Sequence, residues 1–314
     1  MIKVSNGQVL ITGGSGVLGS YLYDLMKDEY DVVIADTTKP QNESVKFIRL
    51  DLTQPFSLSR DFETCIHLAA FVGGIQFFTK HPVENIRDNP RMTSNLLDAA
   101  NASQIEHVLF ASSSVVYQHQ TQFPTSEESV FNSPPPSSAY GMSKLVGEYM
   151  CRSYHEQFGL NYTILRPFNI YGPKEAPDPD YAHVIPELVR KVLSDQYPVE
   201  IFGTGKQTRT FTHGKDTARA FLLSLSNKRA LNDTFNVSGD EEIEVIKLLE
   251  MIWQITGHHE ELKIKNLPSL PHDVQRRFPS NKKIKNLLNW KPEITFNDGL
   301  YETVNWIKTL VTPI

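Results

Sequence analysis

A glycine-rich segment near the N-terminus constrains the fold more than any other feature of the sequence. Residues 11–19 read ITGGSGVLG, after a short apolar run and before an amphipathic stretch. A strand, a glycine-rich turn and a helix in this order form the pyrophosphate site of Rossmann domains, because the glycines allow a tight turn and close approach. The helix N-terminus adds unpaired N–H groups and a positive dipole end. This pattern predicts a dinucleotide site that includes Gly13, Gly16, Val17, Leu18 and Gly19.

Short apolar runs alternate with helical stretches through the first half of the chain. The runs expected as strands are residues 8–12, 31–35, 46–50, 64–68, 107–111 and 162–165. Residues 17–27 and 91–102 are among the amphipathic segments between them, and Pro90 is expected to start or kink the second. Strands that are apolar on both faces and alternate with helices indicate a parallel sheet covered on both sides.

After Arg166 the pattern loosens, with frequent prolines and shorter elements. We therefore predict an α/β protein, with a Rossmann doubly wound parallel sheet and a smaller α/β C-terminal substrate domain. The NAD-binding domain is expected to cover residues 1–168 plus about 212–237. Residues 169–211 plus 238–314 are expected to form the second domain, which would bind a nucleotide sugar.

Composition argues against several classes of protein. The net charge is −5 without a long basic block, and the run of Lys282, Lys283 and Lys285 suits a solvated helix face, so we expect no nucleic-acid partner. No apolar run approaches the roughly 20 residues that span a bilayer, and the start of the chain lacks a cleavage-site pattern. Cys65 and Cys151 lack metal-type spacing, so we predict reduced packing residues, no metal site and a cytoplasmic location.

An acidic residue at the end of the second strand bears on the choice of cofactor. Asp36 lies close to the ~20 residues downstream of the glycines at which dinucleotide-binding domains carry a carboxylate. A carboxylate there accepts hydrogen bonds from the ribose hydroxyls and repels a 2′-phosphate. Asp36 therefore predicts NAD rather than NADP as the cofactor.

A tyrosine and a lysine four residues apart suggest the chemistry. Tyr140 and Lys144 would share one helix face, but with 12 tyrosines in the chain about one such pair is expected by chance. Their position carries the argument, because they follow the fifth strand, which ends in three serines. A tyrosine base must lose a proton from a pKa of ~10, and both Lys144 and a positive nicotinamide ring favour phenolate. The alternative is a packed tyrosine beside a solvated lysine.

These motifs together resemble the extended short-chain dehydrogenase/reductase family, the NAD-dependent epimerases and dehydratases of nucleotide sugars, from about residue 8 to 307. The matching segments are residues 12–19, 51–52, 67–70, 112–117, 140–144, 166–173, 203–211 and 273–292. The resemblance implies catalytic roles for Ser113, Tyr140 and Lys144. It implies cofactor contacts for Asp51, Leu52, Leu68, Ala69, Ala70 and Pro167, and substrate contacts for Ser114, Asn169, His183, Arg209 and Arg277. Paired arginines suit bidentate phosphate binding.

Departures from the family pattern narrow the reaction. Dehydratases that resemble this chain carry Asp-Glu at the positions of Ser114 and Val115. Related decarboxylases carry a Glu at the position of Val115, and 3,5-epimerising relatives carry a Cys there. Valine can replace none of these acid–base groups, so these reactions are disfavoured. Yet residues 72–75 and 182–186 closely resemble GDP-fucose synthase, in which the histidine matching His183 is catalytic. We expect His183 to bind substrate, and a catalytic role stays open. Gln118 stands where glycine or proline is usual.

The simplest reaction for this set is 4-epimerisation of a nucleotide-linked hexose, with a UDP-hexose as the first substrate to test. A GDP- or dTDP-sugar 3,5-epimerase or 4-reductase is the alternative, and hydrogen exchange at carbon would distinguish it. A catalytically idle NAD-binding scaffold is a remote third hypothesis, which an intact Ser-Tyr-Lys set disfavours. The resemblance also implies a homodimer that pairs the helices at residues 91–102 and 138–154.

Overall fold

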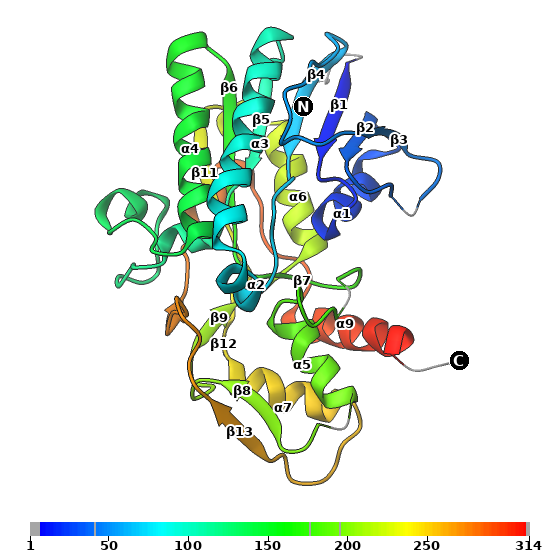
Figure 1. Ribbon diagram of the computed structural model, residues 1–314, viewed down its shortest axis with the longest axis vertical. Coiled ribbons are helices and arrows are strands. Elements are labelled where there is room, and N and C mark those ends of the chain that lie inside the picture. Colours follow the sequence, from blue (N-terminus) through cyan, green and yellow to red (C-terminus); the bar gives the residue numbers. More distant parts are fainter. Residues whose placement is uncertain (1–6, 41, 176, 195, 312–314) are drawn as a thin grey trace.

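The computed structural model describes residues 7–40, 42–175, 177–194 and 196–311. A seven-stranded sheet forms its larger part (Figure 1), with the order β11-β6-β5-β4-β1-β2-β3. All neighbouring strands are parallel, which confirms the predicted Rossmann class. The strands are β1 (Gln8–Thr12), β2 (Asp31–Asp36), β3 (Lys46–Arg49), β4 (Phe62–His67), β5 (His107–Ala111), β6 (Asn161–Pro167) and β11 (Asp233–Val237). The expected outer limits of the two domains, residues 1 and 314, lie outside the described residues.

Helices cover both faces of this sheet. On one face α3 (Pro82–Ala102) packs beside α4 (Ala139–Phe158), and on the other α1 (Val17–Met26) packs beside α6 (Gly214–Leu225). Leu10 and Ile11 are adjacent in β1 and fully buried, one in the core with α3 and α4 and the other in the core with α1 and α6. Strands that are buried on both faces explain the continuous apolar runs of the sequence.

The helix α3 is longer than the sequence predicted. It begins at Pro82 and continues through Pro90, so the expected start at that proline is wrong. Asn85 and Asn89, one turn apart before Pro90, are buried, and Asn89 exchanges hydrogen bonds with the backbone of Phe71. These tertiary contacts hold the first turns of the helix in spite of the backbone hydrogen bond that proline removes.

The smaller part of the molecule has a core of its own (Figure 1). In it α5 (Val184–Leu193), α7 (Val245–Ile255) and α9 (Phe296–Val311) pack together. Its short strands are β8 (Val199–Phe202) with β13 (Ile264–Leu267), and β9 (Thr208–Thr210) between β12 (Glu242–Glu244) and β14 (Arg276–Arg277). The pair β7 (Ile170–Tyr171) and β10 (Thr212–His213) and the helix α2 (Ile75–Lys80) lie between the two parts.

One late segment packs on the sheet rather than in the smaller core. The helix α8 (Lys282–Leu288) lies against β11, and Ile284, Leu288 and Trp290 belong to the core beneath α1 and α6. The Trp290 indole is fully buried and donates a hydrogen bond to the carbonyl of Asp216 at 3.0 Å. Residues 284–290 therefore join the first part of the molecule, although the sequence placed them with the second.

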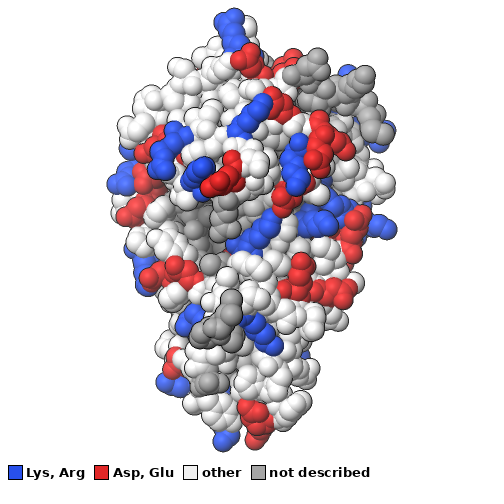
Figure 2. Space-filling model, turned by 90° about the vertical axis from the view of Figure 1, so that its right-hand side faces the viewer, with Lys and Arg blue, Asp and Glu red and all other residues white. Residues whose placement is uncertain are grey.

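The surface in Figure 2 carries basic and acidic side chains in a mixed pattern. In the predicted lysine run, Lys283 and Lys285 form ion pairs with Asp233 and Asp240. Among the described residues, no helix is both long and apolar enough to cross a membrane. The same part of the chain holds no group of three His, Cys, Asp or Glu side chains arranged to bind a metal.

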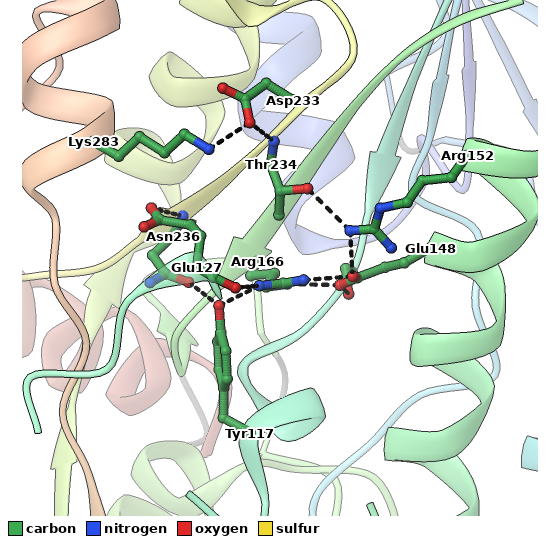
Figure 3. Close-up of polar contacts among 10 residues, drawn as sticks. Tyr117, Glu127, Glu148, Arg152, Arg166, Asp233, Thr234, Asn236 and Lys283 are labelled. Carbon is green, nitrogen blue, oxygen red and sulfur yellow. Dashed lines mark hydrogen bonds and ion pairs between the residues drawn. The ribbon is translucent and has the colours of Figure 1, made fainter. Parts of the chain in front are cut away.

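A buried ion pair fastens α4 to the sheet (Figure 3). Arg166 in β6 and Glu148 in α4 are fully buried. The guanidinium donates from Nε to Oε1 at 2.7 Å and from Nη2 to Oε2 at 2.6 Å. The hydroxyl of Ser112, just beyond β5, donates to Oε1 at 2.6 Å. Ser112 directly precedes Ser113, and Glu148 follows Lys144 by one turn of α4. The contacts of Glu148 with Arg166 and Ser112 therefore fix Ser113 and Lys144 relative to each other.

The remaining nitrogen of Arg166 extends the network to the end of β11. Its Nη1 donates to the Tyr117 hydroxyl and to the Glu127 carbonyl, the latter at 2.8 Å. The Tyr117 hydroxyl donates to Oδ1 of Asn236 at 2.8 Å, and the Asn236 N–H donates to the Glu127 carboxylate at 2.9 Å (Figure 3). The network thus ties the loop after β5 to β6 and β11.

We predict that Arg166→Met lowers the free energy of unfolding by about 3 kcal/mol, because it leaves the buried Glu148 carboxylate with only its longer ion pair to Arg152, at 3.3 Å. The double variant Arg166→Met/Glu148→Leu should recover a large part of this loss, since neither charge then remains. Urea unfolding measures both changes. The control is Lys46→Ala, which removes an exposed ion pair with Asp31 and should cost at most about 1 kcal/mol. Equal losses for Arg166→Met and Lys46→Ala would contradict this account.

Candidate active site

The glycine-rich turn between β1 and α1 leaves space for a bound group above its backbone. Gly13 has a φ of +72°, and a Cβ there would lie 2.4 Å from the backbone nitrogen of Ala69. A Cβ on Gly19 would lie 2.5 Å from the Cα of Gly14. Glycine at these positions lets the turn pack on the end of β4 and α1 pack on the turn. The turn also lines the cavity described below, and the pyrophosphate site that the sequence predicted there stays a prediction.

Asp36 lies at the end of β2 beside this turn. Its Oδ2 accepts a hydrogen bond from the Ser15 N–H, and its Oδ1 accepts one from the Thr38 N–H, each at 3.1 Å. The carboxylate is thus held at the position from which it could meet a ribose. Asp51 is exposed and accepts hydrogen bonds from Thr53. By contrast, the side chain of Leu52 is 3% exposed and packs in the core.

Tyr140 and Lys144 extend from the first two turns of α4 toward the end of β5. Ser138 caps the helix, its hydroxyl accepting a hydrogen bond from the Gly141 N–H at 3.2 Å. The buried Lys144 ammonium donates to the carbonyl of Ala111, the last residue of β5, at 2.8 Å. Phe78 of α2 stacks on the Tyr140 ring with 4.2 Å between centroids and 8° between planes.

Burial sets the acid–base properties of this pair. It raises the pKa of the Tyr140 phenol to about 12, and the neighbouring Ser113 hydroxyl opposes the rise. It also lowers the pKa of Lys144 to about 8, which leaves the ammonium largely protonated at neutral pH. Because the protein alone disfavours phenolate, a nearby positive charge is what would bring Tyr140 into range as a base.

A cavity of about 870 Å³ gathers most of the predicted residues. It extends from the glycine-rich turn past Tyr140 to the smaller part of the molecule. The predicted residues that line it are Gly13, Gly16, Val17, Leu18, Gly19, Leu68, Ala70, Ser113, Ser114, Tyr140, Lys144, Pro167, Asn169, His183, Arg209 and Arg277. Asp36, Asp51, Leu52 and Ala69 are outside its lining.

Two arginines lie side by side at one end of the cavity. Arg209 and Arg277 are register partners in the parallel strands β9 and β14. Arg209 donates to the carboxylate of Asp273 and to the Thr208 carbonyl. Burial, and then repulsion from Arg209, lower the pKa of Arg277 to about 9. Such crowding of like charges favours an anion between or beside them. The Asn169 amide donates to the Thr210 carbonyl at 2.7 Å, close to the same strand.

His183 lies at the start of α5 and is paired with Glu175. Its Nδ1 is 2.5 Å from the Glu175 carboxylate, which also accepts its backbone N–H at 3.0 Å. Burial lowers the pKa of His183, but the charge of Glu175 more than offsets this and leaves the pKa raised. The two segments that resemble GDP-fucose synthase meet here. The Gly74 N–H donates to the Tyr181 carbonyl at 2.8 Å, and a Cβ on Gly74 would lie 2.3 Å from the Ala182 carbonyl oxygen.

Sequence reasoning missed three side chains of this site, namely Glu175, Asp273 and Phe78. Each touches a predicted residue, as the partner of His183, the partner of Arg209 and the cover of Tyr140. No spacing in the sequence pairs Glu175 with His183 or Phe78 with Tyr140. Asp273 begins the segment 273–292 that resembles the family and stands four residues before Arg277, which are the two signals that could have found it.

Comparison with known proteins identifies the family of the chain. The model of the NAD dependent epimerase/dehydratase family matches residues 9–238. The chain belongs to this family. A protein of Methanocaldococcus jannaschii, provisionally named a UDP-glucose 4-epimerase, is 34% identical over 312 residues, which cover 96% of this chain and 98% of the relative. Membership confirms the predicted family, and with it an NAD-dependent enzyme.

Solved structures agree with this assignment. The UDP-glucose 4-epimerase of Thermotoga maritima, solved with UDP-glucose, has a TM-score of 0.86 and 26% identity to this epimerase-family chain, covering 97% of it and 100% of the neighbour. The UDP-glucuronic acid 4-epimerase of Bacillus cereus, solved with UDP-glucuronic acid and NAD, has a TM-score of 0.86 and 29% identity, covering 96% and 99%. Both share the fold over nearly the whole chain.

The position of Asp36 leads to a prediction on cofactor choice. Wild-type protein should bind NAD at least about tenfold more tightly than NADP, because a 2′-phosphate would face the carboxylate, and tenfold needs only about 1.4 kcal/mol. Asp36→Asn should reduce this ratio, whereas Asp31→Asn, at the other end of β2, should leave it unchanged. Titration of cofactor-free protein with both dinucleotides measures the ratio. Equal affinities in the wild type would mean that Lys39 or another cation reaches the phosphate.

Proposed function

We propose that the protein is an NAD-dependent nucleotide-sugar 4-epimerase, with a UDP-hexose as the first substrate to test. One observation carries this proposal: Ser113, Tyr140 and Lys144 line the same cavity as the paired arginines, Arg209 and Arg277. The proposed base, Tyr140, and the two arginines that suit a diphosphate therefore face the same cavity. The UDP-sugar 4-epimerases among the neighbours, with nearly full coverage, support the same reaction.

The proposed roles follow from the contacts of each side chain. Tyr140 accepts the proton of the C4 hydroxyl, and Ser113 shares that hydrogen bond and orients the substrate oxygen. Lys144, held against the Ala111 carbonyl, favours the phenolate by its charge. When bound above the glycine-rich turn and Pro167, NAD supplies the hydride acceptor and later the hydride donor. Arg209 and Arg277 hold the diphosphate, while the 4-keto sugar turns and presents its opposite face.

The alternative is a 3,5-epimerase or a 4-reductase. A 4-reductase would need only Tyr140 and a reduced cofactor, whereas a 3,5-epimerase needs acid–base groups that flank the sugar ring. The His183–Glu175 pair lines the cavity and could supply one of them. Val115 also lines the cavity, where the 3,5-epimerising relatives have cysteine, and its side chain cannot exchange a proton. We therefore assign His183 to substrate placement. An idle scaffold would require none of Ser113, Tyr140 and Lys144.

We also propose that the protein is a cytoplasmic homodimer that pairs α3 and α4 with the same helices of a second copy. On α4 an apolar hollow of about 340 Å³ is lined by Met142, Leu145, Val146, Tyr149, Met150, Ser153 and Tyr154. Tyr149 is 53% exposed beside it. An apolar hollow on a helix of this kind suits a helix-to-helix contact. Sedimentation equilibrium of the wild type tests the dimer.

We predict that Tyr140→Phe retains NAD but loses turnover by at least about 10²-fold, the contribution of a positioned base. Turnover on a panel of UDP-, GDP-, dTDP- and CDP-sugars, with cofactor content measured separately, provides the test. The matched control is Tyr301→Phe, which changes an exposed tyrosine of α9 that lines neither the cavity of Tyr140 nor the hollow on α4. Near-wild-type turnover of Tyr140→Phe would refute the proposed base.

A second prediction separates the two reactions. A 4-epimerase returns the hydride that it removed, so product formed in D2O should carry no deuterium at C3, C4 or C5. His183→Asn should mainly raise KM and leave kcat nearly unchanged, because it weakens substrate placement. His119→Asn, outside the cavity lining, should change neither KM nor kcat. NMR or mass spectrometry of the product decides. Deuterium at C3 or C5 that disappears in His183→Asn would replace the 4-epimerase with the 3,5-epimerase.

A further inference from the structure

A buried glutamine, Gln118, joins three segments that border the cavity. It follows β5 and the short helical turn η1 (Ser114–Tyr117). Its side chain is only 7% exposed. A buried primary amide must have its donors and acceptor satisfied, so the partners of Gln118 show what the side chain holds together.

The amide oxygen of Gln118 holds the start of the helix that carries Tyr140. Its Oε1 accepts the Ser138 N–H at 3.0 Å. Ser138 is the N-cap of α4, and its own hydroxyl accepts the Gly141 N–H at 3.2 Å. Tyr140 lies between these two bonds as the second residue of the helix. Gln118 therefore fixes the backbone from which the Tyr140 side chain extends.

The amide nitrogen of Gln118 holds a segment of the smaller part of the molecule. Its Nε2 donates to the His272 carbonyl at 3.3 Å and to the Ser137 hydroxyl at 3.1 Å. The Ser137 hydroxyl is also 3.1 Å from Nδ1 of His272. His272 has a φ of +65°, a conformation that non-glycine residues rarely adopt. Its backbone direction is thus set by these contacts and not by local preference.

The segment that begins at His272 leads directly to the paired arginines. Asp273 is the next residue, and its carboxylate accepts from Arg209. Arg277, four residues further, lies beside Arg209 in the adjacent strand. A diphosphate bound by the two arginines would therefore hold the same segment that Gln118 grips at its first residue.

We propose that Gln118 is a positioning residue, through which a nucleoside diphosphate bound at Arg209 and Arg277 steadies the first turn of α4 and so the phenol of Tyr140. The consequence for turnover rests on the proposed function. The coupling itself concerns only a nucleoside diphosphate and the backbone of α4. The two can therefore be tested separately.

Hydrogen–deuterium exchange tests the coupling without turnover. NAD-loaded protein is examined with and without saturating UDP, and separately GDP, after calorimetry has shown which one binds. In the wild type, the bound diphosphate should slow exchange of the amides at 138–142 at least threefold. Gln118→Ala should bind it with a Kd within threefold of the wild type but lose this protection. Gln120→Ala is the control, because its amide bonds to Thr121, Gln122 and Ser129 and to neither α4 nor the segment of His272. Protection that persists in Gln118→Ala, or is absent in the wild type, would overturn the proposal.

A second variant provides a kinetic readout that a purely structural role would not move. In Gln118→Glu the carboxylate can still accept the Ser138 N–H but cannot donate to the His272 carbonyl. We expect kcat about tenfold below the wild type at pH 8. The ratio of the kcat of Gln118→Glu to the kcat of the wild type should rise as the pH falls toward the carboxyl pKa of roughly 4–5. The protonated carboxyl group can then donate to the His272 carbonyl again. A ratio that is flat with pH would contradict the assigned donor bond. Absence of 4-epimerase activity in the wild type would refute the proposed function and leave the exchange result to decide on Gln118.

Discussion

The geometry of the active site depends on the buried ion pair between Arg166 and Glu148. The pair joins a strand of the sheet to the helix that carries Tyr140 and Lys144, and Ser112 ties the end of β5 to the same carboxylate. Removing one partner of such a pair is costly because the other charge stays buried. The Glu148 carboxylate accepts two hydrogen bonds from Arg166 and one from Ser112, so rotation of α4 against β5 and β6 would break several at once.

This rigid frame makes one side of the cavity, and a contact between distant segments makes the other. Gly74 packs its backbone against the Ala182 carbonyl, which brings α2 next to the loop before α5. Phe78 of α2 then covers the Tyr140 ring. The surface that would meet the sugar is thus assembled from the helix after β4 and a loop of the smaller part.

The energetics of the proposed base follow from the same burial. Enclosure raises the pKa of Tyr140 to about 12 and lowers that of Lys144 to about 8. To act as a base near neutral pH, the phenol needs a pKa several units lower, and each unit corresponds to about 1.4 kcal/mol. Lys144 supplies one positive charge, and the arrangement gains another only when the cofactor is bound. We therefore expect the phenol to act as a base only while NAD is bound.

The sequence by itself determined the parallel sheet, the dinucleotide turn and the Tyr140–Lys144 pair, because each rests on local periodicity or on a short motif in a fixed setting. It allowed a start or a kink of α3 at Pro90, and the start is wrong, because buried Asn89 outweighs the local cost of proline through its contacts with Phe71 and α4. It could not pair Glu175 with His183, or assign a partner to Gln118, whose amide meets a carbonyl 154 residues away. Neither contact leaves a period or spacing in the sequence, because the first closes an irregular loop and the second joins segments far apart in the chain. Only the packing of the smaller part against the sheet decided them.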